Sequence, residues 1–220
     1  MIRAFSRSAR TLGMGLVLTL GSASAAWAAV PPIIPVAGSH TAVLSAASWQ
    51  MVRDAPDGFV LGHPKALRLT VFLDPNCSVC HRFYEELQPL IRAGKVSVRV
   101  LPVGVIKPTS LGKSAHIELP FFDPALHQTP AHLLAVNEGG FQKGDVGGHI
   151  SPVKNPGAVS VVTDHDAILE RLTALYAGFP RGRLETPVVI FTKAGQHQVI
   201  FGAPPKGAAA LVRDISRPDG

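Results

Sequence analysis

The sequence predicts an α/β domain, and two observations support that fold class. A buried-strand pattern at Leu67–Leu73 (LRLTVFL) is followed by a helix-spaced segment and then by a second strand pattern, Val96 to Val100. Strand, helix and strand in this order form a βαβ unit. Two more strand patterns and a helix near the C-terminus extend the same α/β arrangement.

The chain begins with a segment typical of a cleavable export signal. Three arginines lie in the first ten residues, and an apolar stretch, Thr11 to Leu20, follows that is too short to span a bilayer. Ala26-Trp27-Ala28 then has the small-x-small pattern that signal peptidase reads. We therefore expect residues 1–28 to be a signal peptide and the mature protein to be periplasmic. An uncleaved membrane anchor is the alternative.

Charge and cysteine content narrow the class of protein. The 220 residues carry a formal charge of +6, which falls to +3 without residues 1–28, because that segment holds three arginines and no acidic residue. Such a small surplus, with no run of Lys or Arg, does not favour a nucleic-acid partner. The two cysteines, Cys77 and Cys80, are too close for their bridge to close a long stabilising loop.

The region before the first buried strand is predicted to be an extended leader with a short linker helix, residues 29–66. Residues 30–40 are rich in proline, which favours extended backbone, and a short helix is expected near Ala42 to Arg53. The α/β domain itself is predicted to cover residues 67–220. Its first helix starts at Ser78, contains Pro89 and ends at Gly94.

Residues 108–182 are predicted to form a mostly helical insertion. One helix is expected near 123–137, interrupted by Pro130, and another at 164–177 with Thr163 as its N-cap and Asp166 in its first turn. Glycine-rich residues 139–157 between them read as a long loop. They lack the GxxxxGK[ST] pattern of a phosphate-binding loop.

The C-terminal part returns to strands. Val188 to Thr192 and Gln198 to Phe201 have a hairpin-like spacing across Lys193-Ala194-Gly195, and a last helix is expected from Gly207 to Ile215. Thr186-Pro187 comes immediately before the first of these strands.

The Cys77-x-x-Cys80 spacing predicts a redox-active dithiol. A helix that starts here directly after a strand places unpaired N–H groups and the positive end of its dipole beside the first sulfur, which stabilises a thiolate. Cys80, one turn further in, is then close enough to resolve a mixed disulfide. A zinc half-site completed by histidines such as His63, His81 or His116 remains an alternative, as does a purely structural bridge.

The stretch FLDPNCSVCHRFYEELQPLIRAGKVSVRVLPVGVIKP resembles the catalytic segment of the DsbC/DsbG family of periplasmic disulfide isomerases, most closely its DsbG branch. It shares the F-x-D-P-x-C-x-x-C stretch that ends at Cys80, the aromatic pair after it and the helix proline. TPVVIF, which begins at Thr186, is similar to the family's Thr plus cis-Pro segment.

This resemblance implies a thioredoxin-like fold with a helical insertion and assigns roles to four residues. Cys77 would be the nucleophile and Cys80 the resolving thiol, while Thr186 and Pro187 would bind an extended substrate by strand-like pairing. It also implies protein substrates with disulfides or oxidised cysteines, a membrane thiol reductase of the DsbD type as electron donor, and no cofactor.

The chain departs from the family in three places. Ser78-Val79 differs from the family's usual dipeptides, which leaves the redox potential open. His81 follows the second cysteine, where a surface or capping role is expected. Only residues 29–66 precede the first buried strand, so we expect the N-terminal dimerisation domain to be shortened or absent, and the protein to be a monomer or a non-standard dimer.

The sequence therefore predicts a periplasmic thiol-disulfide oxidoreductase that acts as an isomerase or reductase. Two functions of other classes stay open. One is a periplasmic Cu or Zn chaperone that uses the two thiolates, since soft ligands suit both metals. The other is a non-catalytic assembly module of the same fold.

Overall fold

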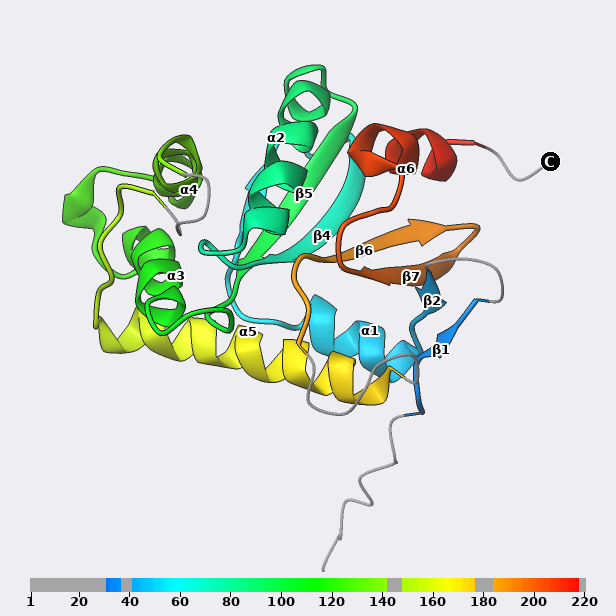
Figure 1. The fold of residues 1–220 in the computed structure, drawn as a ribbon, viewed down its shortest axis with the longest axis horizontal. Coiled ribbons are helices and arrows are strands. Elements are labelled where there is room, and N and C mark those ends of the chain that lie inside the picture. Colours follow the sequence, from blue (N-terminus) through cyan, green and yellow to red (C-terminus); the bar gives the residue numbers. More distant parts are fainter. Residues whose placement is uncertain (1–30, 37–40, 142–147, 177–183, 218–220) are drawn as a thin grey trace, which may run out of the picture.

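A seven-stranded sheet forms the centre of the computed structural model, which describes residues 31–36, 41–141, 148–176 and 184–217 (Figure 1). Its order is β1-β2-β7-β6-β4-β5-β3. β4 and β5 are parallel, and the other neighbouring pairs are antiparallel. The strands are β1 (Ile34–Pro35), β2 (Ala42–Val43), β3 (Phe59–Leu61), β4 (Leu67–Leu73), β5 (Val96–Pro102), β6 (Val188–Lys193) and β7 (Gln196–Phe201). The predicted α/β class is confirmed.

Helices cover both faces of the sheet. α2 and α6 lie on one face and α1 and α5 on the other, while α3 and α4 extend the molecule beside α5 and the N-terminal end of α2 (Figure 1). The helices are α1 (Ala46–Arg53), α2 (Ser78–Arg92), α3 (Ser110–Glu118), α4 (Pro130–Gly139), α5 (Pro156–Leu175) and α6 (Gly207–Ile215), with short 3-10 turns at Leu119–Phe121 and Pro124–Leu126. Among the described residues, no helix is both long and apolar enough to cross a bilayer.

Alternating side chains of the central strands build two separate cores. Val71 of β4 and Val189 of β6 belong to the core beneath α2 and α6. Their neighbours Phe72 and Val188 belong to the core beneath α1 and α5. Because side chains alternate along a strand, a strand covered on both faces needs apolar residues at almost every position. The LRLTVFL run of β4 meets that need.

The sequence predicted these central elements closely. β4 has the expected bounds, α2 begins at Ser78, and α6 spans the predicted Gly207–Ile215. The β6–β7 hairpin turns through Ala194 and Gly195, both at positive φ. Strong periodicity and short connections made these segments readable.

Residues 29–66 were wrongly expected to be a leader and linker helix. In the described part of this region, β2 pairs with β7 and β3 pairs with β5, so the segment adds strands to both sides of the sheet. Only the helix, α1, matches, and it starts at Ala46 rather than Ala42 because β2 occupies residues 42 and 43. β3 was missed because its three residues are too few to show a period.

The predicted start of the insertion's long helix is also wrong. α5 begins at Pro156, and its N-cap is Asn155, whose side chain accepts a hydrogen bond from the Ala158 N–H. Thr163 lies inside the helix, and its hydroxyl donates to the Val159 carbonyl. Asp166 is likewise internal. Glycine and proline suggested a loop here, although proline suits the first turn of a helix, where no N–H partner is needed.

Proline misled the prediction of α4 in the same way. Pro130 begins this helix instead of interrupting it, and Thr129 caps it by accepting from the His132 N–H. α3 was not predicted at all. The predicted signal peptide, residues 1–28, and positions 142–147 of the predicted loop 139–157 lie outside the described residues.

Candidate active site at the start of α2

Cys77 and Cys80 lie at the N-terminus of α2, as the sequence predicts. Cys77 is the N-cap, and its Sγ accepts a hydrogen bond from the Cys80 N–H at 3.3 Å. Both are free thiols in the structure. Cys77 retains 7% of its accessible surface whereas Cys80 retains none, so only Cys77 reaches solvent. The outer sulfur is therefore the one that an external disulfide meets first.

The loop before β6 brings Thr186 and Pro187 against these sulfurs. The Thr186-Pro187 bond is cis, and the Cys77 thiol donates to the Thr186 carbonyl at 3.4 Å. The Pro187 carbonyl accepts from the Gly202 N–H at 2.8 Å, which fixes this loop to the end of β7. The structure thus brings together all four site residues that the sequence named, although 109 positions separate Cys77 from Thr186.

The two thiols have opposite acidities. A hydrogen bond from the Cys80 thiol is the main cause that lowers the pKa of Cys77 to about 6; burial opposes it, and the Thr186 side chain and the backbone N–H groups of Cys80 and Val79 assist. Burial, and then the neighbouring Cys77 thiolate, raise the pKa of Cys80 well above its ordinary value. One sulfur is poised as a thiolate and the other as its hydrogen-bond donor.

The turn between β4 and α2 is held by a fully buried carboxylate, Asp74. Its Oδ1 accepts from the Asn76 N–H and the Ser110 hydroxyl, each at 2.8 Å. Its Oδ2 accepts from the N–H groups of Val105 and Ile106, each at 2.9 Å. Burial raises the pKa of Asp74, and these four hydrogen bonds oppose that rise. Asp74 therefore joins the turn before Cys77 to the loop after β5.

Two further contacts fix that second loop. The Gly104 N–H donates to Asp166 of α5 at 2.7 Å, and the Asn76 side chain donates to the hydroxyls of Thr109 and Ser110. A Cβ at Gly104 would lie 2.4 Å from the Cα of Leu111, so this close approach requires glycine. These hydrogen bonds and this close packing fix the backbone that leads into Cys77.

His81 does not have the surface role expected for it. Its Nδ1 lies 2.7 Å from Oε2 of the buried Glu138, and its ring stacks on Phe141 at 4.3 Å. Asn137 donates to Glu138 and to the Pro75 carbonyl. Burial raises the pKa of Glu138. The end of α4 in the predicted insertion is therefore tied directly to the active-site helix and turn.

The zinc alternative finds no support in the geometry of the described residues. No three or more His, Cys, Asp or Glu side chains among them form a group arranged to hold a metal ion. His116 is bound to the Ser151 carbonyl, His63 accepts from the Lys65 N–H, and His81 is paired with Glu138.

Sequence reasoning missed Asp74 and Glu138 as parts of the site. Asp74 entered the sequence analysis only as part of the F-x-D-P-x-C-x-x-C stretch and was given no role, although an acidic residue between a strand and a CxxC indicates a capped turn. Glu138 gave no signal, because 57 positions separate it from His81.

Comparison with known proteins supports the same reading. No protein-family model matches the chain. Over 55 residues, 25% of the chain, the sequence is 47% identical to the thiol:disulfide interchange protein DsbG of Escherichia coli (strain K12). Over 59 residues, 26% of the chain, it is 46% identical to the DsbG of Pseudomonas aeruginosa. These segments span only 22% and 23% of the length of those relatives.

Two solved structures share the fold. A periplasmic thioredoxin-like protein from Salmonella enterica serovar Typhimurium has a TM-score of 0.50 at 17% identity, covering 78% of this chain and 97% of that one. The catalytic domain of Proteus mirabilis ScsC has a TM-score of 0.50 at 16% identity, covering 77% and 94%. The resemblance predicted from the sequence is therefore confirmed: this chain has a thioredoxin-like fold with a short segment similar to DsbG.

Proposed function

We propose that the protein is a thiol-disulfide oxidoreductase that exchanges electrons with disulfides or oxidised cysteines of other proteins. The observation that carries this proposal is the contrast between the two thiols: an outer sulfur, Cys77, whose pKa is about 6, and a fully buried one, Cys80, whose pKa is raised. Thiol exchange needs such a pair, because the attacking sulfur must be a thiolate while the resolving sulfur stays protonated until the mixed disulfide has formed.

The reaction proceeds by two exchanges. The Cys77 thiolate attacks one sulfur of a substrate disulfide, forms a mixed disulfide and releases the other sulfur as a thiolate, which takes up a proton. Cys80 then loses its proton and attacks the Cys77 sulfur, so that the second substrate thiolate leaves and a Cys77–Cys80 disulfide forms. The substrate gains two electrons and the dithiol loses two. If the released substrate thiolate instead attacks a second disulfide of the same substrate, a different substrate thiolate is freed. When that thiolate displaces Cys77 from the mixed disulfide, the substrate disulfides are rearranged without net electron transfer.

Thr186 is the residue best placed to align the substrate. Its carbonyl lies beside Cys77, and its N–H has no hydrogen-bond partner among the described residues. An extended peptide laid along it would bring its own cysteine to Cys77 by strand-like pairing. Pro187 would contact the substrate without a backbone hydrogen bond, because it lacks an N–H and its carbonyl accepts from the Gly202 N–H.

The cellular setting belongs to the same proposal. Residues 1–28 have the features of an export signal, and a short segment of the chain is similar to DsbG. We place the protein in the periplasm, with a membrane thiol reductase of the DsbD type returning electrons to the oxidised pair.

Reduction of insulin by dithiothreitol tests the activity. The wild-type protein is expected to accelerate precipitation of the insulin chains, and Cys77→Ser to abolish that acceleration. Arg171→Ala, an exposed change on α5, serves as the control. An equal rate for the wild type and Cys77→Ser would overturn the proposal.

The direction of electron flow needs a second measurement, the equilibrium reduction potential of the Cys77–Cys80 pair. A potential of about −270 mV would show that the protein is a reductant, and a potential of about −120 mV would show that it is an oxidant.

A further inference from the structure

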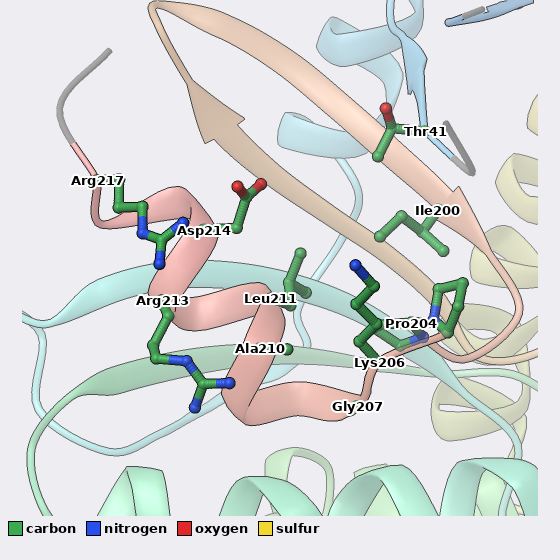
Figure 2. Close-up of a pocket in the computed structure, with 11 residues that line it drawn as sticks. Thr41, Ile200, Pro204, Lys206, Gly207, Ala210, Leu211, Arg213, Asp214 and Arg217 are labelled. Carbon is green, nitrogen blue, oxygen red and sulfur yellow. The ribbon is translucent and has the colours of Figure 1, made fainter. Parts of the chain in front are cut away.

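We propose that a basic groove beside α6 docks an extended acidic segment of another protein. The basic groove consists of Lys206, Arg213 and Arg217 around a floor of Ile200, Pro204 and Leu211, and it encloses a hollow of about 570 Å³. Figure 2 shows the α6 side chains on one side of this hollow and Ile200 and Thr41 on the other.

The three cations lie on α6 and at its two ends. Lys206 immediately precedes the helix, Arg213 lies in its last turn, and Arg217 lies two residues past its end. At 1.5 Å per residue, the nine residues of α6 extend over roughly 13 Å between the two terminal cations. An extended peptide advances roughly 3.3 Å per residue, so about four of its residues span that length.

The positive charge of the basic groove is not neutralised within the described residues. Lys206, Arg213 and Arg217 form no side-chain hydrogen bond or ion pair there. The one acidic residue in the lining, Asp214, is paired with Lys193 at 2.9 Å. A second hollow of about 440 Å³ beside the first adds Lys95 to Arg213 and Arg217, so the positive surface continues past α6. A ligand rich in Asp or Glu complements this surface.

The shape of the basic groove favours a peptide over a membrane surface. Its floor is apolar and recessed, so a peptide side chain can rest between the cations. A membrane-binding helix needs apolar side chains that project outward, but Ala208, Leu211 and Val212 of α6 are buried against the core. α6 could therefore bind a lipid surface only through its charged side chains.

Docking at the basic groove leaves the dithiol accessible. α6 packs on α2 well beyond its first turn: the Ala208 N–H donates to Glu86 at 2.7 Å, and Glu86 lies nine residues after Cys77. At 1.5 Å per residue this is roughly 13 Å along the helix. A partner held here and a substrate at Thr186 can bind at the same time.

Fluorescence anisotropy with a short labelled peptide of alternating Asp and Leu tests the proposal. We expect binding by the wild type that weakens as salt rises, and a loss of affinity of about tenfold or more in Arg213→Glu/Arg217→Glu. The control, Lys65→Glu/Arg171→Glu, changes the net charge equally at exposed sites elsewhere and should lose less than about twofold. Both variants should retain wild-type insulin reduction, which shows that they are folded and separates this test from that of the proposed function.

Three results would overturn the proposal: no binding of the peptide to the wild type, equal losses in the two double variants, or equal affinity for a peptide with Asn in place of Asp. Binding to vesicles containing about one-third phosphatidylglycerol tests the alternative that the basic groove binds lipid. If these vesicles bind the protein through Arg213 and Arg217 and the peptide does not, the basic groove is a lipid site instead.

Discussion

At the scale of single residues, the surroundings of two cysteines three positions apart shift their pKa values in opposite directions. Cys77 keeps a small exposed surface and receives hydrogen bonds from the Cys80 thiol and from backbone N–H groups. Cys80 has no exposed surface, so burial opposes its ionisation. Because both residues are cysteines, the difference between their pKa values comes from hydrogen bonding and solvent access.

The acidity of Cys77 gives the first prediction. Thiolate absorbance at 240 nm should rise with a midpoint near pH 6 in the wild type and be missing from that range in Cys77→Ser. Because the folded-state pKa is depressed, the thiolate stabilises the reduced protein fully above the unfolded pKa of about 8.5, and this stabilisation is lost as the pH falls through 6. A midpoint near 8.5 would contradict the assigned hydrogen bonding.

The buried side chain of Glu118 gives a second prediction for a single residue. It is fully buried, neither carboxyl oxygen has a hydrogen-bond partner in the described part of the chain, and burial raises its pKa to about 8. A raised carboxyl pKa means that stability is lost as the pH rises through that value. Glu118→Gln should therefore raise the free energy of unfolding at pH 9 by about 2 kcal/mol and change it little at pH 5. Urea denaturation at both values provides the measurement; equal effects would refute it.

At the scale of elements, the site depends on two loops and on how their ends are capped. The turn after β4 and the loop after β5 meet at Asp74, which satisfies four donors without exposure to solvent. Since β4 and β5 are parallel neighbours, their C-terminal ends lie at the same edge of the sheet. One carboxylate can therefore hold both connections.

Replacing Asp74 gives the element-scale prediction. In Asp74→Asn, an amide NH₂ replaces one acceptor oxygen and faces buried donors, so the free energy of unfolding should fall by about 2–3 kcal/mol. Asp166→Asn is the matched control, because Asp166 accepts one N–H, from Gly104, and an Asn oxygen can still accept it. Chemical denaturation compares the two; an equal loss in both would show that Asp74 has no special role.

Some elements were predictable from the sequence and others were not, for physical reasons. α2 has apolar residues at helical spacing, β4 is a continuous apolar run, and α6 follows two prolines, so the positions of these elements followed from local pattern. The starts of α4 and α5 were missed because Pro130 and Pro156 were read as breakers, although each follows a capping Thr or Asn. β2 and β3 carry too few residues to reveal a period, and tertiary pairing alone defines them.

At the scale of the whole molecule, the fold assembles the candidate site from distant segments. The CxxC was visible locally, and the resemblance to DsbG pointed to Thr186 and Pro187. The contact between His81 and Glu138 was not predictable, because it depends on how the helices after β5 return to the sheet. The same folding places the basic groove beside the C-terminal half of α2 and the dithiol at its start.

Trapping of a mixed disulfide shows whether Cys77 attacks the substrate and Cys80 resolves the intermediate. Reduced Cys80→Ala is incubated with a disulfide-bonded peptide, quenched with acid and analysed by intact mass, with Cys77→Ala as the matched variant. A peptide adduct on Cys77, sensitive to reductant, is expected in the first protein and none in the second. An adduct on Cys80 in Cys77→Ala at a comparable rate, or no adduct in Cys80→Ala, would contradict it.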